Sequence, residues 1–483
     1  MKKPALKPAE NRHDWLFPIL CLFTVTFFIY RDFDIRMIYG YACLGLVLGL
    51  HVLCRLIQDR PPVLNPLRMS MLLLAAAVLV NFLRPDSRHD IDTISFIISM
   101  VICCGFTVMA DPTEKSANIA LGICFAGAVG IAVFVQFFEQ NPWYFWNWFL
   151  MKLSQTSGTE LCHYVPKGYG FALGGLTFTD YVLYIGVAVC CGYAACGRKF
   201  DWKSVLALIC AGLFLETILI VGRRGELLCS VVCVLLLVLA LCGKKQRRFL
   251  IIGGVITAVV GFAAIVALLP WLKQFQPLVR YVMTVEQLLS GQDITSGRSD
   301  LYVLAWNAFL DNPIFGIGWN QFQTQIPAEF LAIHGQGAVK NAHCVYLQFL
   351  TETGIVGTPF LVAPMVYCYY LVCRQLSRLK KHPSELRTAR MLCVSSFMLQ
   401  SYLLILSIYD PTFQKIVFWC FYALALMMLA AALKLEGYTP DDPVSRLLNK
   451  LIRLCAPPFV LVWNWVAGLF GPLRRNSKGE PNP

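Results

Sequence analysis

The chain has 483 residues, of which 57% are hydrophobic and 14% are charged, and its formal net charge is +13. Soluble domains carry about 45–50% apolar and about 25% charged residues, so this chain has too few charges for a soluble surface. Several apolar runs approach the ~20 residues that a membrane-spanning helix needs. The composition therefore indicates a polytopic membrane protein. It argues against a soluble enzyme, a disordered scaffold or a nucleic-acid-binding protein, in spite of the positive charge.

Apolar runs separated by charged or turn-forming residues predict about twelve membrane-spanning helices. They lie near residues 15–30, 37–57, 69–83, 91–110, 117–138, 171–196, 204–221, 226–242, 249–270, 345–373, 391–409 and 416–434. Basic residues precede the first run, as in a signal sequence. No clear small-residue cleavage site follows, so we expect a retained first helix.

Two interruptions, 139–170 and 271–344, are too long for simple turns. Lys and Arg accumulate on the cytosolic side of membrane proteins. If the N-terminus is cytosolic, most of the 41 Lys and Arg fall on the inner side, and both long interruptions face outward. We therefore predict an all-α polytopic protein with both termini inside and a large helical outward loop.

This topology divides the chain into five parts. They are an N-terminal tail over 1–14, nine helices over 15–270, the outward loop 271–344, three helices over 345–434 and a C-terminal tail over 435–483. Within the tail, the apolar segment 451–472 contains two prolines and is followed by two arginines. This pattern favours a helix lying in the cytosolic interface over a thirteenth span.

Two adjacent arginines break the charge rule, because they lie in a short outward turn. Arg223 and Arg224 stand in the sequence VGRRGELL, between two predicted helices. One interpretation is that their side chains reach the interface along apolar stems. The other is an anion site, because the guanidinium fork matches phosphate oxygens and a helix N-terminus favours negative charge.

The large outward loop supplies two more candidates. Arg298 precedes a helix-like stretch in TSGRSDLYVLAWNAFLDNPIFGIGWNQF, and His343 precedes the tenth predicted helix in KNAHCVYLQFLTETGIVGTPF. Arg298 is equally compatible with a capping or solvent-exposed role. A histidine at the mouth of a helix bundle can act as a general base, although a lone histidine is more often structural.

Together these segments resemble the O-antigen ligase/polymerase superfamily. In that family the pattern His-(Asn/Ser/Gln)-x9-Gly-x-x-(Gly/Thr) opens the helix after the large periplasmic loop. Here His343 is followed at matching positions by Gly354 and Gly357, with Cys344 where the family has Asn, Ser or Gln. The resemblance covers roughly residues 170–375 and rests on the order and placement of the motifs.

The resemblance implies a glycosyltransferase of the bacterial inner membrane, with a GT-C-like fold, an active site facing the periplasm, and neither metal nor cofactor. Family members are similar in moving a glycan from undecaprenyl diphosphate to an acceptor hydroxyl, with the lipid tail lying between helices among the membrane lipids. It implies His343 as general base and Arg224 and Arg298 as diphosphate ligands. Arg223 is an alternative, because the RxxxL pattern fits either arginine. The pattern that begins at His343 favours a ligase with lipid A-core as acceptor over a polymerase or a protein O-oligosaccharyltransferase.

Acidic residues suggest two other interpretations. Asp180 and Glu216 fall in or near predicted helices, where acids are costly and often functional, so a proton-coupled transporter is the alternative of a different class. No repeat of interrupted helices supports it. Asp32 and Asp34 form a DxD motif, but their loop is too short to resemble those of metal-dependent lipid-linked glycosyltransferases.

The smaller outward loop offers accessory residues. His163 and Lys167 lie in the sequence HYVPKGYG and could contact sugar or diphosphate. Glu216 precedes the arginine turn by about two helical turns and could pair with one of its arginines. Cys162 and Cys344 both face an oxidising compartment in this topology, which would permit a disulfide between the two loops.

Overall fold

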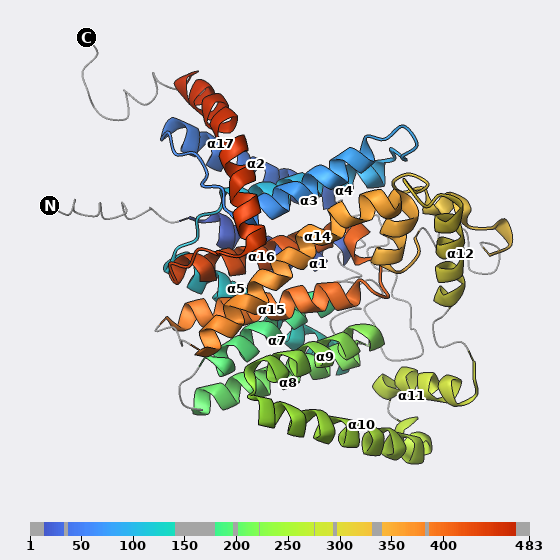
Figure 1. The fold of residues 1–483 in the computed structure, drawn as a ribbon. Helices are drawn as coiled ribbons and strands as arrows, with labels where there is room; N and C mark the ends of the chain where they lie inside the picture. Colours follow the sequence, from blue (N-terminus) through green and yellow to red (C-terminus); the bar gives the residue numbers. More distant parts are fainter. Residues whose placement is uncertain are drawn as a thin grey trace, which may run out of the picture.

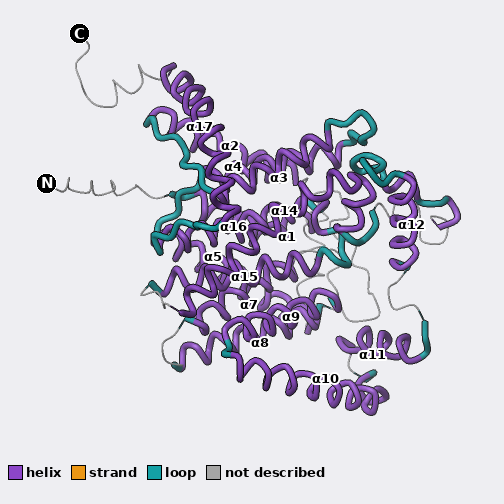
Figure 2. The backbone as a smooth tube through the Cα atoms, in the orientation of Figure 1, coloured by secondary structure: helices purple, strands orange, loops and turns teal. Residues whose placement is uncertain are grey.

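The computed structural model describes residues 14–469, apart from 33–36, 141–178, 197–200, 222, 275, 293–296, 331–340 and 382–385. Within these residues all regular structure is helical, and no strand occurs (Figure 2). Residues 1–13 of the N-terminal tail and 141–170 of the 139–170 loop lie outside the described residues.

Twelve helices coincide with the predicted spans. They are α1 (Leu16–Asp32), α2 (Met37–Ile57), α3 (Pro66–Phe82), α4 (Ile91–Met109), α5 (Glu114–Gln140), α7 (Thr179–Ala195), α8 (Trp202–Ile220), α9 (Arg224–Leu241), α10 (Lys244–Leu272), α14 (Val345–Lys381), α15 (Arg387–Leu406) and α16 (Ile416–Leu435). In the described part of the chain, ten helices are long and apolar enough to cross a membrane, and α1, α3 and α7 are shorter apolar helices. The chain is therefore an all-α polytopic membrane protein, as its composition predicts.

The segment between α10 and α14 is largely helical. It contains α11 (Gln276–Leu289), α12 (Arg298–Asp311) and the short helix η1 (Phe322–Gln325). In Figure 1, α12 stands across the direction of α14 and α15 at one end of the bundle. We call this the loop end; it also holds the turns 83–90 and 407–415 and the described residues Val221 and Arg223 between α8 and α9.

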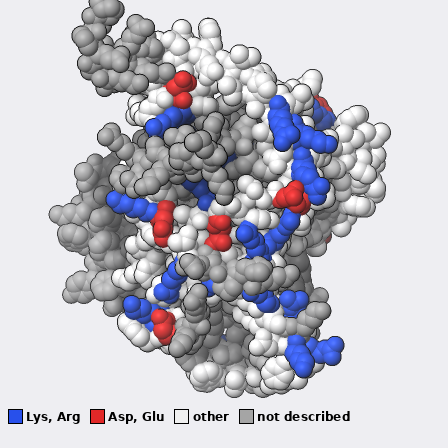
Figure 3. All heavy atoms as spheres, turned by 60° about the vertical axis from the view of Figure 1, so that its left-hand side comes forward, with Lys and Arg blue, Asp and Glu red and all other residues white. Residues whose placement is uncertain are grey.

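The opposite end, which we call the basic end, holds the turns 58–65, 110–113, 242–243 and 436–442. Arg55 donates a hydrogen bond of 2.7 Å to the carbonyl of Met109, and buried Arg68 donates to the carbonyls of Val63 and Ala110. Two of these acceptors, the carbonyls of Met109 and Ala110, lie at the end of α4, where helical partners are lacking. Figure 3, in which this side is turned forward, shows Lys and Arg spread over much of the surface and Asp and Glu in fewer places.

The centre of the bundle is formed by α7, α15 and α16, whose side chains are almost all buried. Tyr184 of α7 stacks on Tyr402 of α15 with ring centroids 4.1 Å apart. By contrast, α10 exposes apolar residues such as Phe249, Val259 and Trp271. An apolar helix with so little protein contact is stable in this position only if lipid covers it.

The last described helix, α17 (Pro443–Leu469), is continuous through both of its prolines. In Figure 1 it runs across the direction of the bundle helices on the side opposite α12. Leu448 is buried, whereas Leu454, Leu461 and Trp465 are exposed. Its length and composition also suit a membrane span. Its direction supports the interfacial interpretation, which stays a prediction.

Helix α14 is broken near the loop end at Gly354, whose φ of 64° and ψ of −171° are not helical. The break frees backbone groups, and the segment 313–318 pairs with them. The N–H of Ile355 donates to the carbonyl of Pro313 (2.9 Å), and the N–H groups of Ile317 and Gly318 donate to the carbonyls of Thr351 and Glu352 (both 3.0 Å). Because buried backbone groups must be paired, this exchange fixes the loop onto α14.

The break requires glycine for two reasons. A positive φ is costly for other residues, and a Cβ at position 354 would lie 2.3 Å from the carbonyl oxygen of Ile314. We expect Gly354→Ala to lower the free energy of unfolding by about 2–5 kcal/mol, measured by thermal unfolding in detergent.

Gly291→Ala is the matched control for this prediction. Gly291 also has a positive φ, of 67°, but no atom lies within 4 Å of a Cβ built there. Its substitution should cost only the backbone term, about 1–2 kcal/mol. Equal losses in both variants would show that the contact between the loop and α14 does not constrain position 354.

Candidate active site

Four segments meet at the loop end, around the turn that carries His343. They are residues 341–344, the turn 407–415 between α15 and α16, the N-terminus of α12, and the turn before α9. The N–H of Val345 donates to the carbonyl of Ser407 (2.8 Å), which ties the first two together. The site therefore combines the outward loop with three helix junctions.

A chain of buried polar groups holds the turn 341–344. The N–H of Ala342 donates to Oε1 of Gln348 (3.1 Å), and Nε2 of Gln348 donates to Oε1 of Glu352 (2.9 Å). The same carboxylate oxygen accepts from the N–H of Phe322 (3.3 Å). Glu352 stands one turn of α14 from Gln348 and directly before the break, so the broken helix positions the turn.

His343 occupies this turn in a left-handed conformation, with φ 53°. Such a backbone is costly for a residue other than glycine, and residues of this kind cluster at functional sites. The side chain is half-buried, and among the described residues Nδ1 has no hydrogen-bond partner. The turn therefore holds an imidazole whose Nδ1 is buried and, among the described residues, unpaired.

The surroundings keep His343 neutral. Burial, and to a smaller extent Arg298 and Lys415, lower its pKa, and Asp410 raises it; together they bring the pKa to about 4. At neutral pH the ring is therefore an unprotonated base.

Asp410 is the acidic group shared by the whole cluster. Its carboxylate forms an ion pair with Lys415, and its side chain is 13% exposed. Burial lowers the pKa of Arg223, but Asp180, Glu226 and Asp410 outweigh it and raise that pKa. Sequence reasoning missed Asp410; the only signal was an Asp–Pro pair in an outward turn between two apolar runs.

Arg298 lies at the first position of α12, after Gly297 with φ 80°. Its Nη1 donates to the carbonyl of Tyr409 (2.8 Å), and its guanidinium carbon is 6.0 Å from the centroid of the Tyr409 ring. This contact joins the outward loop to the turn that carries Asp410. It also places the arginine within electrostatic range of His343.

The two adjacent arginines point to different partners. Arg223 lies 3.6 Å from the carboxylate of Glu226 and within range of Asp410, whereas Nη1 of Arg224 donates to Oγ1 of Thr284 on α11. The glycine after them is required by packing, because a Cβ at Gly225 would lie 2.4 Å from the Tyr409 ring. The structure thus brings Arg223 to the cluster and Arg224 toward α11.

Other predicted residues lie apart from the cluster or outside the description. Among the described residues, Glu216 accepts a hydrogen bond from Gln136 of α5 and contacts neither arginine of the turn. His163, Lys167 and Cys162 lie outside the described residues, so the accessory roles and the disulfide with Cys344 stay predictions. Of the DxD motif, Asp32 ends α1, and Phe33 and Asp34 lie outside the described residues.

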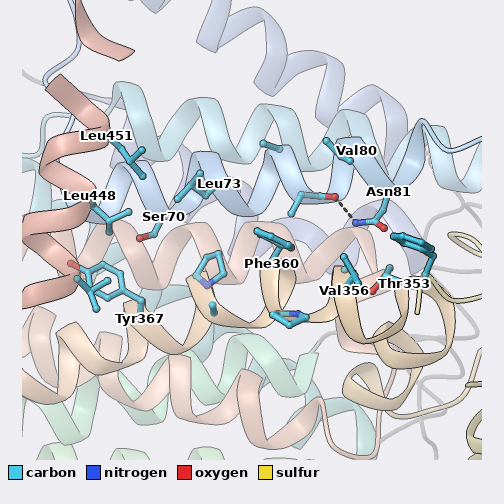
Figure 4. Close-up of a pocket in the computed structure, with 18 of the residues that line it drawn as sticks. Ser70, Leu73, Val80, Asn81, Thr353, Val356, Phe360, Tyr367, Leu448 and Leu451 are labelled. Atoms are coloured by element: carbon cyan, nitrogen blue, oxygen red, sulfur yellow. Dashed lines mark hydrogen bonds between the residues drawn. The ribbon is translucent and has the colours of Figure 1, made fainter. Parts of the chain in front are cut away.

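An apolar groove of about 800 Å³ runs along α14, between α3 and α17. Figure 4 shows it extending from Asn81 and Thr353 at one end to Tyr367 and Leu448 at the other. Arg84 lines the loop-end mouth and donates to the carbonyls of Phe315 and Gly316 in the loop segment paired with α14. The groove has the apolar lining and the length along α14 that suit a hydrocarbon chain.

The cluster holds two guanidiniums, of which Arg223 is paired with Glu226, a neutral imidazole, and the half-buried carboxylate of Asp410, which is paired with Lys415. This set can bind a phosphate-bearing substrate and accept a proton beside it. Among the described residues, no group of three or more His, Cys, Asp or Glu side chains is arranged to hold a metal ion.

A family model described as O-antigen ligase matches residues 206–362 of the chain. The matched segment begins within α8 and ends within α14, so it includes both arginines of the turn, Arg298 and His343. It ends before Asp410. No curated protein matches the chain.

We expect removal of the Lys415 charge to raise the pKa of His343, because this cation lowers that pKa and neutralises Asp410, which raises it. In Lys415→Gln, the midpoint for modification of His343 by diethyl pyrocarbonate should move above about 4. Site-resolved mass spectrometry over pH 3–8 measures it, since only the neutral ring reacts.

Lys273→Gln is the matched control, because Lys273 also forms an ion pair, with Glu286 at 2.6 Å, on the outward loop. This variant should leave the His343 midpoint unchanged. The same midpoint in wild type and Lys415→Gln would show that the 407–415 turn does not set the charge of His343.

Proposed function

We propose that this chain is a membrane glycosyltransferase that transfers a glycan from undecaprenyl diphosphate to a hydroxyl of lipid A-core. It belongs to the O-antigen ligase/polymerase superfamily, because residues 206–362 match the model of that family's domain. The observation that carries the proposal is the meeting of Arg298, Arg223 and a neutral His343 at the loop end. We assign this end to the periplasmic face, because Lys and Arg gather at the opposite end.

The arginines would stabilise the leaving group. As the bond between the anomeric carbon and the diphosphate oxygen breaks, negative charge grows on the diphosphate. Arg298 and Arg223 are positioned by backbone and carboxylate contacts before the substrate arrives, which is the arrangement that stabilises a transition state most. Arg224 is close enough in sequence to contact the same diphosphate from the α11 side.

His343 would act as the general base. The acceptor oxygen attacks the anomeric carbon while its proton moves to the imidazole, so the ring becomes positively charged as the diphosphate leaves. The neutral ring that burial and Arg298 favour is the form that can accept this proton. Asp410 would then stabilise the imidazolium, since its charge favours the protonated ring.

The proposal also needs room for lipid. The groove between α3, α14 and α17 reaches the loop segment that fixes the break in α14, at the loop end of the bundle. We assign it to a hydrocarbon chain of one of the two lipid substrates. No metal is needed in this scheme, because the guanidiniums supply the positive charge.

We expect lysine substitutions to separate the roles of the arginines, because an ammonium cannot donate two parallel hydrogen bonds to a phosphate. Arg298→Lys and Arg223→Lys should each lower kcat/KM about 100-fold in a transfer assay, and Arg224→Lys should lower it less. A larger loss in Arg224→Lys than in Arg223→Lys would assign the diphosphate contact to the other arginine.

The function itself is tested by the glycolipid banding pattern of a strain that lacks the gene. The strain should show bare lipid A-core, with polymer still attached to undecaprenyl diphosphate. Wild type and His89→Ala should restore the ladder, because His89 lies in the turn between α3 and α4 and contacts the carbonyl of Phe82. His343→Ala should insert normally and restore less than about 1% of the transfer.

The other outcomes identify the alternatives. Core bearing a single repeat would show a polymerase. An unchanged ladder would contradict the ligase and direct the search to protein glycosylation or to transport. Full restoration by His343→Ala would contradict the general base.

A further inference from the structure

A second pocket lies at the basic end, between α5, α7, α8 and α15, and its volume is about 610 Å³. Its inner wall is formed by Leu121, Phe125, Cys190, Leu206 and Cys210. Along α8, Lys203, Leu206 and Cys210 follow one another on one face over roughly 10 Å. The pocket therefore leads from a cation at the helix N-terminus to an apolar interior.

Two cations stand at its mouth. Lys203 and Arg387 are exposed residues at the N-terminal ends of α8 and α15, and each lies beside an aromatic ring. Nζ of Lys203 is 5.8 Å from the centroid of Trp202, and the guanidinium carbon of Arg387 is 3.6 Å from that of Tyr193. Aromatic residues beside cations are typical of the level where a membrane meets water.

The nearby polar groups leave these cations available. Asp201 is the acid that faces Arg387, but its carboxylate caps α8 by accepting from the N–H and the hydroxyl of Ser204 (2.8 and 2.7 Å). Oγ1 of Thr388 donates to Oδ1 of Asn118 (2.9 Å) across the pocket wall. In the described part of the chain, neither Lys203 nor Arg387 forms an ion pair.

We propose that this pocket binds an anionic phospholipid of the leaflet at the basic end. One acyl chain would fill the apolar interior, and the phosphate would contact Lys203 and Arg387. The chemistry selects this ligand: the interior offers hydrocarbon contacts, and the mouth offers two positive charges between transmembrane helices, an arrangement that holds anionic head groups. The site is independent of the transferase proposal, since it lies at the end opposite His343.

Binding is measured by native mass spectrometry on the full chain in neutral detergent, with palmitoyl-oleoyl phosphatidylglycerol or phosphatidylcholine. Wild type should retain phosphatidylglycerol far better than it retains phosphatidylcholine. The double variant Lys203→Ala/Arg387→Ala should bind it about 30-fold more weakly. The matched control Lys245→Ala/Arg248→Ala removes two exposed cations of α10 at the same end and should bind like wild type.

Ala207→Trp keeps both cations but fills the pocket that Ala207 lines, so it should also lose the lipid while its unfolding temperature stays close to wild type. Equal retention of the two lipids by wild type would overturn the proposal. So would equal weakening by the two double variants, which would show general surface attraction. Competition by glycerol 3-phosphate as strong as by the lipid would show an anion site without a chain.

Discussion

The break in α14 at Gly354 is the constraint on which the rest of the loop end depends. A break in a helix leaves backbone donors and acceptors without their helical partners, and those that are buried need other partners. The segment 313–318 satisfies them, so the outward loop is fastened to the bundle by backbone hydrogen bonds. Because Glu352 lies just before the break and reaches the turn at Ala342 through Gln348, the same break positions His343.

Charge balance determines what the positioned histidine can do. Arg298 and Lys415 oppose protonation of His343, and Asp410 favours it. The carboxylate of Asp410 thus faces Lys415, Arg223 and His343, which carry or can acquire positive charge. In the proposed reaction, proton transfer to His343 and departure of the diphosphate separate charge inside a half-buried cluster, where fixed charges act more strongly than in water.

The sequence predicts the fold class and the span positions well, because hydrophobic length is a local property of the chain. Arg298 and His343 could be proposed as candidates from the sequence, since His343 opens a pattern with glycines at fixed spacing and Arg298 precedes a helix-like stretch of the outward loop. Asp410 could not, because an acid in a short turn has no pattern of its own, and its importance comes from packing against α9 and α12.

Pairings between distant segments were the least predictable feature. Glu216 precedes the arginine turn in sequence, yet its side chain meets Gln136 of α5 because helix rotation sets the contact. Likewise, RxxxL fits Arg223 and Arg224 equally, and only the partners in the structure distinguish them: Arg223 lies within range of Asp410, whereas Arg224 contacts Thr284. The end of α14 also differs from the predicted span, which stops at residue 373. The helix continues to Lys381 along a charged surface that hydropathy assigns to a loop.

The central claim is that a histidine kept neutral by its surroundings accepts the proton of the acceptor hydroxyl. It is tested most directly by the pH dependence of glycan transfer, with the purified chain in liposomes that contain an undecaprenyl-diphosphate glycan and lipid A-core. The account predicts a rate that stays level from pH 8 to about 5 and falls with a midpoint near 4, where His343 becomes protonated. A midpoint near 6.5, the value of an unperturbed histidine, or no transfer at any pH would contradict it.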